Sequence, residues 1–267
     1  MRAHLVQFDI VWENRERNFR RVESMLAEAS VAEGDLVLLP ELFDSGFSLR
    51  TAETADHRQE TAAFLARLAS NYGATVQGGR TLLPDREAKA CNAATIYGPS
   101  GDLLAEYHKM HPFSFGREPE AFAPGHEIIT YTWRSEAASL SVCPAICYDL
   151  RFPELFRIAA LRGAEVFALG ANWPNARQHH WRTLLIARAI ENQAVALGVN
   201  RVGADPTLEY VGGSIAVGPQ GEILGELGAE EAVLSVTIDP DAIRSWRSKF
   251  PALTDIRLLN REKPLAD

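Results

Sequence analysis

Three residues of different chemistry, Glu41, Lys109 and Cys147, each stand directly after a segment typical of a buried strand. A carboxylate, an ammonium group and a thiol can supply a base, a cation and a nucleophile. The ends of buried strands are the places where a sheet presents side chains to a cleft. We therefore interpret the three residues as one catalytic set. Taken singly, Cys147 also fits a buried apolar cysteine, and Glu41 and Lys109 also fit solvated charges at loop starts.

Proton transfer within this set requires shifted pKa values. The ordinary pKa values of a glutamate and a cysteine differ by roughly 4 units, which is about 5 to 6 kcal/mol against transfer. We expect burial to raise the pKa of Glu41 and the Lys109 ammonium to lower the pKa of Cys147. Cys147 also precedes Pro153, a residue suited to open a helix, and a helix N-terminus favours a thiolate. The set therefore requires an enclosed site.

The elements that must position these residues alternate between strand and helix. Apolar runs of strand length cover residues 3–10, 35–40, 74–81, 92–97, 103–108, 140–146 and 166–170. Segments of helical period cover residues 14–32, 61–72, 153–162 and 178–193, and two or three further strands follow. A turn signal at residues 99–101 joins two strands into a hairpin. We predict an α/β protein with two packed mixed sheets and helices outside, in a single domain over residues 1–267 without a sequence repeat.

Composition and charge restrict the partners. The chain has 267 residues, 46% of them hydrophobic, with 27 Lys and Arg against 35 Asp and Glu and a formal net charge of −8. That balance disfavours nucleic acid and anionic membrane surfaces, because both attract basic proteins. We expect a small-molecule substrate instead.

The sequence also predicts a location. The first ten residues lack the pattern of a secretion signal, and no apolar run approaches the roughly 18 residues that span a bilayer. Three cysteines, Cys91, Cys143 and Cys147, are too few for a disulfide framework. We expect no membrane association, a cytoplasmic location and reduced thiols.

The segments around the three residues resemble a known family. LLPELF around Glu41, YHKMHPF around Lys109 and ICYDLRFPE around Cys147 are similar to the signature segments of the nitrilase superfamily of carbon–nitrogen hydrolases. The similarity extends to APG at 123–125, ANWP at 171–174 and ARAIENQ at 187–193, and so covers nearly the whole chain. The resemblance implies a four-layer α-β-β-α sandwich, a homodimer, and hydrolysis of non-peptide carbon–nitrogen bonds without a metal or cofactor.

ANWP, ARAIENQ and CYDLRFP are most similar to the omega-amidase branch, which removes ammonia from 2-oxoglutaramate and 2-oxosuccinamate. The resemblance implies that Glu41 is the general base, Cys147 the nucleophile and Lys109 the cation of the oxyanion site, helped by the backbone N–H of Tyr148. The reaction would pass through a thioester on Cys147.

The family often has a second glutamate a few residues before the glycine that matches Gly125. Glu118 and Glu120 are both candidates, and we favour Glu118 for its offset from Gly125. The resemblance also implies that Arg151 and Asn172 contact the substrate.

Arg151 can pair with the distal carboxylate of an acid substrate, although it can equally brace the following helix. Trp173 and Phe43 are candidate pocket walls or core residues. Pro112 and Gly213 depart from the family pattern, which affects the substrate more than the reaction.

Several alternatives remain open. Cys143 and Cys147 with the adjacent His179 and His180 do not form a zinc pattern, so we predict no metal and place Cys143 in the core.

A Cys–His hydrolase with His108 or His111 as base would leave Glu41 and Lys109 unexplained. The same catalytic set also suits an N-carbamoyl amino acid amidohydrolase, an amidase on deaminated glutathione or a nitrilase. From another class, a non-catalytic binding protein can be built on the same fold.

Overall fold

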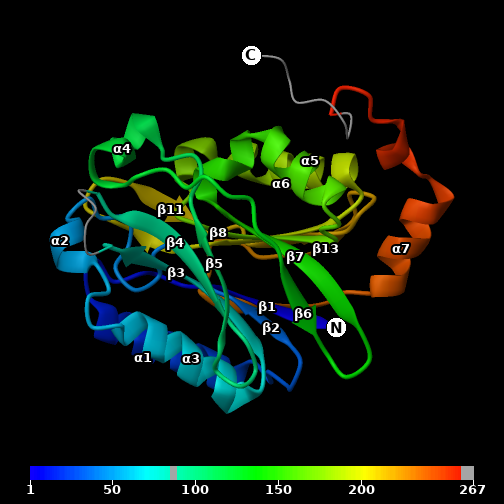
Figure 1. The fold of residues 1–267 in the computed structure, drawn as a ribbon. Coiled ribbons are helices and arrows are strands. Elements are labelled where there is room, and N and C mark those ends of the chain that lie inside the picture. The colour runs from blue at the N-terminus through cyan, green and yellow to red at the C-terminus, as the bar shows by residue number, and fades with distance from the viewer. Residues whose placement is uncertain (85–88, 260–267) are drawn as a thin grey trace.

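Two six-stranded sheets lie face to face in the middle of the molecule, and helices cover the outer face of each (Figure 1). The computed structural model describes residues 1–84 and 89–259. The layers run α1 and α3, first sheet, second sheet, α5 and α6. The predicted four-layer α-β-β-α sandwich with mixed sheets is therefore confirmed.

The first sheet has the strand order β14-β1-β2-β3-β4-β5. Its β1, β2 and β3 are parallel, and the other neighbours pair antiparallel. Its strands are β1 (Arg2–Gln7), β2 (Leu36–Leu38), β3 (Thr75–Leu82), β4 (Cys91–Tyr97), β5 (Leu103–His108) and β14 (Ala232–Thr237). Helices α1 (Arg15–Glu28) and α3 (Glu60–Tyr72) cover its outer face. The Asn14 side chain caps α1 by accepting from the N–H of Arg17, and Gly73 ends α3 in the left-handed conformation.

The second sheet has the strand order β13-β12-β9-β8-β7-β6, with β7, β8 and β9 parallel. Its strands are β6 (Tyr131–Arg134), β7 (Ser139–Ile146), β8 (Val166–Ala171), β9 (Val195–Asn200), β12 (Ile215–Val217) and β13 (Ile223–Glu226). Helices α5 (Pro153–Leu161) and α6 (Gln178–Asn192) cover its outer face, and Pro153 opens α5.

Short elements complete the chain. They are the helices α2 (Thr51–Thr54), α4 (Glu118–Ala121) and α7 (Pro240–Lys249), the 3-10 helices η1 (Ser114–Gly116), η2 (Cys147–Arg151), η3 (Asn175–Arg177) and η4 (Ala252–Asp255), and the paired strands β10 (Val202–Ala204) and β11 (Glu209–Val211). Arg247 of α7 donates to the carbonyls of Ala164 and Gln193, which follow α5 and α6 in the chain.

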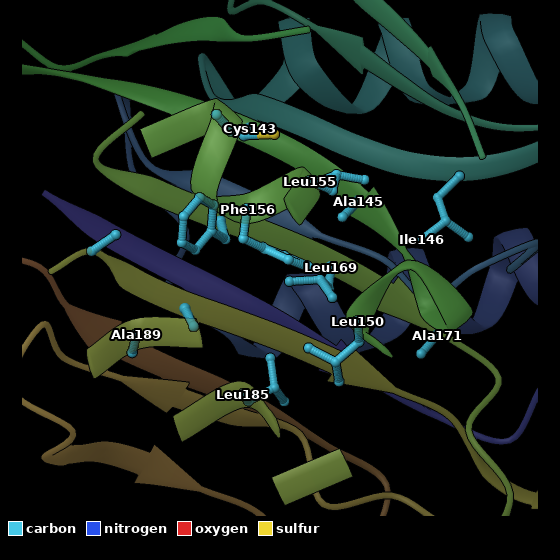
Figure 2. Packing of buried hydrophobic residues seen from close by; sticks show 14 of the residues in the cluster. Cys143, Ala145, Ile146, Leu150, Leu155, Phe156, Leu169, Ala171, Leu185 and Ala189 are labelled. Atoms are coloured by element: carbon cyan, nitrogen blue, oxygen red, sulfur yellow. The ribbon is translucent and has the colours of Figure 1, made fainter. Parts of the chain in front are cut away.

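Three apolar clusters fill the spaces between the four layers. One joins α1 and α3 to the first sheet, one fills the space between the sheets, and one joins the second sheet to α5 and α6. Figure 2 shows the last of these, where Phe156 and Leu155 of α5 meet Leu169 of β8 and Leu185 of α6. Cys143 of β7 belongs to this cluster and is buried, as predicted.

All the individually predicted strands and helices are present, with ends that differ by a few residues. The apolar run 35–40 gives only the short strand Leu36–Leu38, because the chain turns after it toward Glu41. Six strands follow α6, where two or three were expected, and strand β6 and the helices α2, α4 and α7 were not predicted. The signal for α7 was Asp239-Pro240, an N-cap whose side chain accepts from the N–H of Asp241, followed by proline at the first helical position.

The topology brings the predicted strand ends together. Strand β2 leads to Glu41, β7 leads to Cys147 and β8 leads to Asn172. Strand β5 runs antiparallel to β4 and leads to Lys109. Side-chain contacts between Glu41 and both Lys109 and Asn172 show that these ends meet at one edge of the two sheets.

Candidate active site

A buried lysine between two buried glutamates forms the centre of the site. Lys109 Nζ donates to Glu41 Oε1 at 2.7 Å and to Glu118 Oε2 at 2.8 Å. All three side chains are essentially inaccessible to water. Burying one cation with two anions is tolerable only where further donors support the carboxylates.

Two asparagines provide those donors. Asn92 Nδ2 donates to Glu41 Oε1 and to Glu118 Oε1, each at 2.8 Å. The backbone N–H of Asn172 donates to Glu41 Oε2 at 2.9 Å, and its Nδ2 donates to the Glu41 carbonyl at 2.7 Å. Glu41 is therefore fixed by Lys109, Asn92 and Asn172. Sequence reasoning missed Asn92, which opens a predicted strand and carries no distinguishing pattern.

The close approach of the Glu41 turn to both sheets depends on two glycines. A Cβ at Gly79 of β3 would lie 2.4 Å from the backbone nitrogen of Leu42, and a Cβ at Gly170 of β8 would lie 2.8 Å from the carbonyl oxygen of Leu39. Leu42 itself has a φ of 45°, a strained value for a non-glycine residue. The backbone is thus forced into a sharp turn that aims Glu41 inward.

Cys147 occupies a second sharp turn, the first residue of η2 after β7. Its φ is also 45°, and its Sγ lies 3.8 Å from the carbonyl oxygen of Asn172. The first turn of a helix leaves backbone N–H groups without partners inside the helix, and Tyr148 follows Cys147 in the first turn of η2. A thiol and a carboxylate that line one cavity, at the start of a helix, suit acyl transfer.

Asp149 ties the loop after Lys109 to the turn at Cys147. Its Oδ2 accepts from Tyr107 Oη at 2.8 Å and from the N–H of Ile146 at 3.0 Å, while its Oδ1 contacts His111 Nδ1 at 2.8 Å. Sequence reasoning missed this buried residue. The signal was present, because aspartate at the third position of a helix after its cap often accepts from the cap N–H.

The expected pKa shifts of the base and the nucleophile were wrong in direction. Burial and the Glu41 charge raise the pKa of the Cys147 thiol well above its ordinary value. Burial raises the pKa of Glu41, but the Lys109 ammonium and the N–H donors outweigh it and hold that pKa below the ordinary value. Lys109 was expected to favour the thiolate. Two carboxylates already neutralise its charge, so a third anion is disfavoured and the resting site holds a thiol beside a carboxylate.

The second glutamate is Glu118. Burial and the Glu41 charge raise its pKa, although Lys109 opposes this shift. Its Oε2 also accepts from the backbone N–H of Phe113. Glu120 lies at the surface and pairs with Arg117 at 2.7 Å.

Two cavities open onto Cys147. The larger has a volume of about 310 Å³, and the smaller about 30 Å³. Both are lined by Phe113, Cys147, Asn172 and Pro174. Tyr148, Arg151 and Trp173 line the smaller cavity, so the structure places these predicted residues beside the thiol. Neither Pro112 nor Gly213 is among the described lining residues.

The expectation that Phe43 forms a pocket wall is corrected. Phe43 is fully buried in the cluster under α1 and α3, with its ring 6.0 Å from those of Phe19 and Phe64. On an extended chain, Glu41 and Phe43 would point to the same side, because side chains alternate between the two sides. The turn at Leu42 breaks that alternation and sends Phe43 into the core.

The two histidines considered as bases are engaged elsewhere. His111 contacts Asp149 and stacks on Phe152 with ring centroids 3.8 Å apart. His108 Nε2 lies 3.0 Å from Glu106 on the outer side of β5. Within residues 1–84 and 89–259, no three His, Cys, Asp or Glu side chains are grouped as metal ligands. In the same ranges, no helix is both long and apolar enough to cross a bilayer.

Comparison with known proteins assigns the class. The sequence matches the carbon–nitrogen hydrolase family over residues 2–248. It is 35% identical to a 2-oxoglutaramate amidase from Paenarthrobacter nicotinovorans, over 94% of this chain and 87% of the relative. It is 33% identical to a Staphylococcus aureus protein described as a hydrolase in the agr operon, over 97% of this chain and 98% of the relative.

A solved structure agrees with these matches. A CN-hydrolase superfamily protein from Xanthomonas campestris, with 33% identity, has a TM-score of 0.89 over 97% of this chain and 98% of that chain. The chain therefore belongs to the carbon–nitrogen hydrolase family, the nitrilase superfamily. It is an omega-amidase-like hydrolase of non-peptide carbon–nitrogen bonds, and the resemblance stated from the sequence is confirmed.

Proposed function

We propose that this enzyme hydrolyses the terminal amide of short 2-oxo dicarboxylate monoamides, 2-oxoglutaramate and 2-oxosuccinamate, to the acid and ammonia. The main support is the fixed Glu41 carboxylate beside the Cys147 thiol at a 310 Å³ cavity. The 2-oxoglutaramate amidase among its relatives supports this choice of substrate.

In the first half of the reaction Cys147 is the nucleophile and Glu41 the general base. The resting thiol is protonated, so Glu41 removes the proton as the sulfur attacks the amide carbon. The tetrahedral intermediate then collapses, Glu41 returns the proton to the leaving nitrogen, and ammonia departs. A thioester between Cys147 and the acyl group remains.

The oxyanion of the intermediate requires donors that are in place before the reaction. The backbone N–H of Tyr148 and the Lys109 ammonium take this role. Burial lowers the pKa of Lys109, whereas the charges of Glu118 and Glu41 raise it. The effect of the two carboxylates is larger, so Lys109 stays protonated. Glu118 thus positions Lys109 and keeps it protonated.

In the second half Glu41 removes a proton from water, which attacks the thioester carbon. The carbon–sulfur bond breaks, the thiolate recovers the proton from Glu41, and the carboxylic acid leaves. One water is consumed and one ammonia is released per turnover, without a metal or cofactor. Asn172 keeps Glu41 oriented through both halves, and Arg151 receives the distal carboxylate.

Ammonia release by purified protein tests the substrate. We expect fast turnover of 2-oxoglutaramate or 2-oxosuccinamate, and little from N-carbamoyl-β-alanine or a simple nitrile. A carbamoyl substrate releases carbon dioxide as well as ammonia, and a nitrile consumes two waters per ammonia. Turnover of one of those compounds alone would replace the substrate, and turnover of none would favour a binding protein on this fold.

The single domain over residues 1–267, the homodimer and the cytoplasmic location remain predictions. Sedimentation equilibrium of the purified chain tests the dimer. A monomer at micromolar concentration with full turnover would contradict it.

A further inference from the structure

The two cavities that meet at Cys147 differ in charge. The charged side chains of the larger cavity are already paired. Glu41 and Lys109 pair with each other, and Arg50 pairs with Glu13 at 2.8 Å and with Glu53 at 3.2 Å. A carboxylate entering this cavity would meet no uncommitted cation among the described lining residues.

The larger cavity also has an anionic wall. Asp205 lines it and accepts from the backbone N–H groups of Thr207 and Leu208, each at 2.7 Å, and from Tyr210 Oη. These donors hold Asp205 in its ionised form, since burial raises its pKa but the donors outweigh burial and lower it. The ionised Asp205 therefore repels a substrate carboxylate in the larger cavity.

The smaller cavity has the opposite character. Arg151 and Arg177 both line it, and no Asp or Glu of the described residues does. Arg151 Nη2 lies 3.2 Å from His180 Nδ1, and its guanidinium lies 4.9 Å above the Trp173 ring. Arg177 lies 5.3 Å above the ring of Phe113. Within residues 1–84 and 89–259, neither arginine forms a salt bridge with a carboxylate. Aromatic faces fix a guanidinium without neutralising its charge.

The backbone at Arg177 is also fixed. Trp173 Nε1 donates to the Arg177 carbonyl at 2.8 Å, and the Arg177 N–H donates to the carbonyl of Pro174 at 3.0 Å. Arg177 directly precedes α6, whose N-terminus adds a positive partial charge at the same place. Two oriented cations next to a nucleophile suit planar, bidentate recognition of a carboxylate.

The size of the smaller cavity fits one end of a substrate. A water-sized group needs about 10 to 15 Å³ by this measure, so 30 Å³ admits a carboxylate but not a whole substrate. In 2-oxoglutaramate the amide carbon and the carboxylate carbon are joined by four C–C bonds, which span roughly 5 Å. Cys147 lines both cavities, so the amide carbon can lie at the thiol where the cavities meet while the carboxylate enters the smaller cavity beside the arginines.

We infer that Arg177, together with Arg151, binds the distal carboxylate of the substrate in the smaller cavity, and so selects acidic amides over neutral ones. The inference rests on the proposed function for the identity of the substrate. It adds Arg177 as a specificity residue, and it assigns the acid end to the smaller cavity and not to the larger one at Arg50.

Steady-state kinetics test the assignment. In Arg177→Gln we expect kcat/KM for 2-oxoglutaramate to fall roughly ten- to hundredfold, mainly through KM, because a charge-assisted interaction is lost. Arg50→Gln tests the rival cavity and should change kcat/KM by less than about twofold. Arg182→Gln, an exposed α6 residue paired with Glu226, is the matched control and should behave like the wild type.

A protection assay separates the subsite from the substrate assignment. Iodoacetamide alkylates Cys147, mass spectrometry locates the product, and glutarate or pentanamide is added as a protecting ligand. We expect glutarate to protect the wild type, and the concentration that halves the alkylation rate to rise roughly ten- to hundredfold in Arg177→Gln. Protection by pentanamide, which lacks the carboxylate, should be the same in both proteins.

Three results would overturn the inference. They are unchanged glutarate protection in Arg177→Gln, an equal loss of pentanamide protection, and a loss of glutarate protection in Arg50→Gln. If the wild type does not hydrolyse 2-oxoglutaramate but glutarate protection still depends on Arg177, the proposed function fails while the carboxylate subsite stands.

Discussion

The two sheets have the same order of parallel and antiparallel neighbours, although they share no sequence repeat and their edge strands β14 and β6 come from different places in the chain. In the first, an antiparallel edge strand is followed by three parallel strands and two antiparallel ones, β14-β1-β2-β3-β4-β5. The second repeats this pattern as β6-β7-β8-β9-β12-β13. Helices α1 and α5 follow corresponding strands, as do α3 and α6 (Figure 1). The molecule therefore places two equivalent sets of strand ends at one edge.

The chemistry at those ends is not equivalent. The first half supplies the charges, Glu41 after β2 and Lys109 after β5. The second half supplies the thiol Cys147 after β7 and the amide Asn172 after β8. Neither half contains all the residues of the site. The fold provides equivalent strand ends in both halves, and each half supplies different residue types.

The corresponding ends of β1 and β9 serve a structural purpose instead. Asp9 follows β1, and its Oδ1 accepts from Arg201 Nη2 at 2.7 Å. Arg201 is fully buried, donates to the carbonyls of Val202 and Ile10, and stacks 4.5 Å from the Tyr210 ring. This ion pair holds the loop that forms one wall of the larger cavity. One edge thus combines a reactive cluster with a structural one.

The largest expected effect concerns the thiol of the second half. Cys147→Ala should lower kcat by at least about 10⁴-fold, because the covalent route is lost, while the melting temperature changes little. The matched variant is Cys143→Ala, which removes a thiol from the core beneath α5 and should keep its kcat. Activity in Cys147→Ala together with inactive Cys143→Ala would assign the nucleophile to the wrong cysteine. Ammonia release and a thermal melt measure both variants.

The next effect concerns the charge of the first half. Glu41→Gln keeps the shape but removes the base, so kcat should fall by roughly 10² to 10⁴-fold. The same change removes an anion beside Cys147, and its thiol pKa should fall toward the ordinary value. Alkylation of Cys147 by iodoacetamide at pH 8 should therefore become roughly tenfold faster. Slower alkylation in Glu41→Gln would contradict the balance of charges described above.

The sequence predicted the two packed sheets with helices outside, and the strand ends that carry Glu41, Lys109 and Cys147, because local rules determine both. Alternation of apolar runs and helical segments identified the elements, and the strand ends followed from them. The pattern left Phe43 open between pocket wall and core, and the turn at the left-handed residue Leu42 places it in the core. Asn92, Asp149 and the pKa directions depend on which strands become neighbours, and that information lies in the topology and not in local spacing.

The structural cluster should affect stability more than chemistry. Arg201→Met removes the donors of several buried carbonyls and should lower the free energy of unfolding by about 2 to 4 kcal/mol. Asp9→Asn should cost less than about 1 kcal/mol, because the Asp9 side chain is 54% exposed. Urea unfolding midpoints measure both. A smaller loss in Arg201→Met than in Asp9→Asn would show that the buried guanidinium does not hold the loop.

The smallest expected effect is the response of the wild type to pH. Turnover requires ionised Glu41, and Lys109 with its neighbouring donors holds that pKa below the ordinary value against burial. Activity should then be lost only as the pH falls below about 4.5. The first proton taken up on acidification goes to Glu118, whose pKa burial raises, and this leaves Glu41 ionised.

Because burial raises the pKa of Cys147 and the carboxylates raise that of Lys109, no alkaline loss of activity is expected below about pH 9. The profile of kcat/KM should vary by less than about threefold between pH 5 and 9. An acid limb near pH 6 to 7 would show either that burial dominates at Glu41 or that turnover also requires ionised Glu118, and both contradict the balance of charges described above.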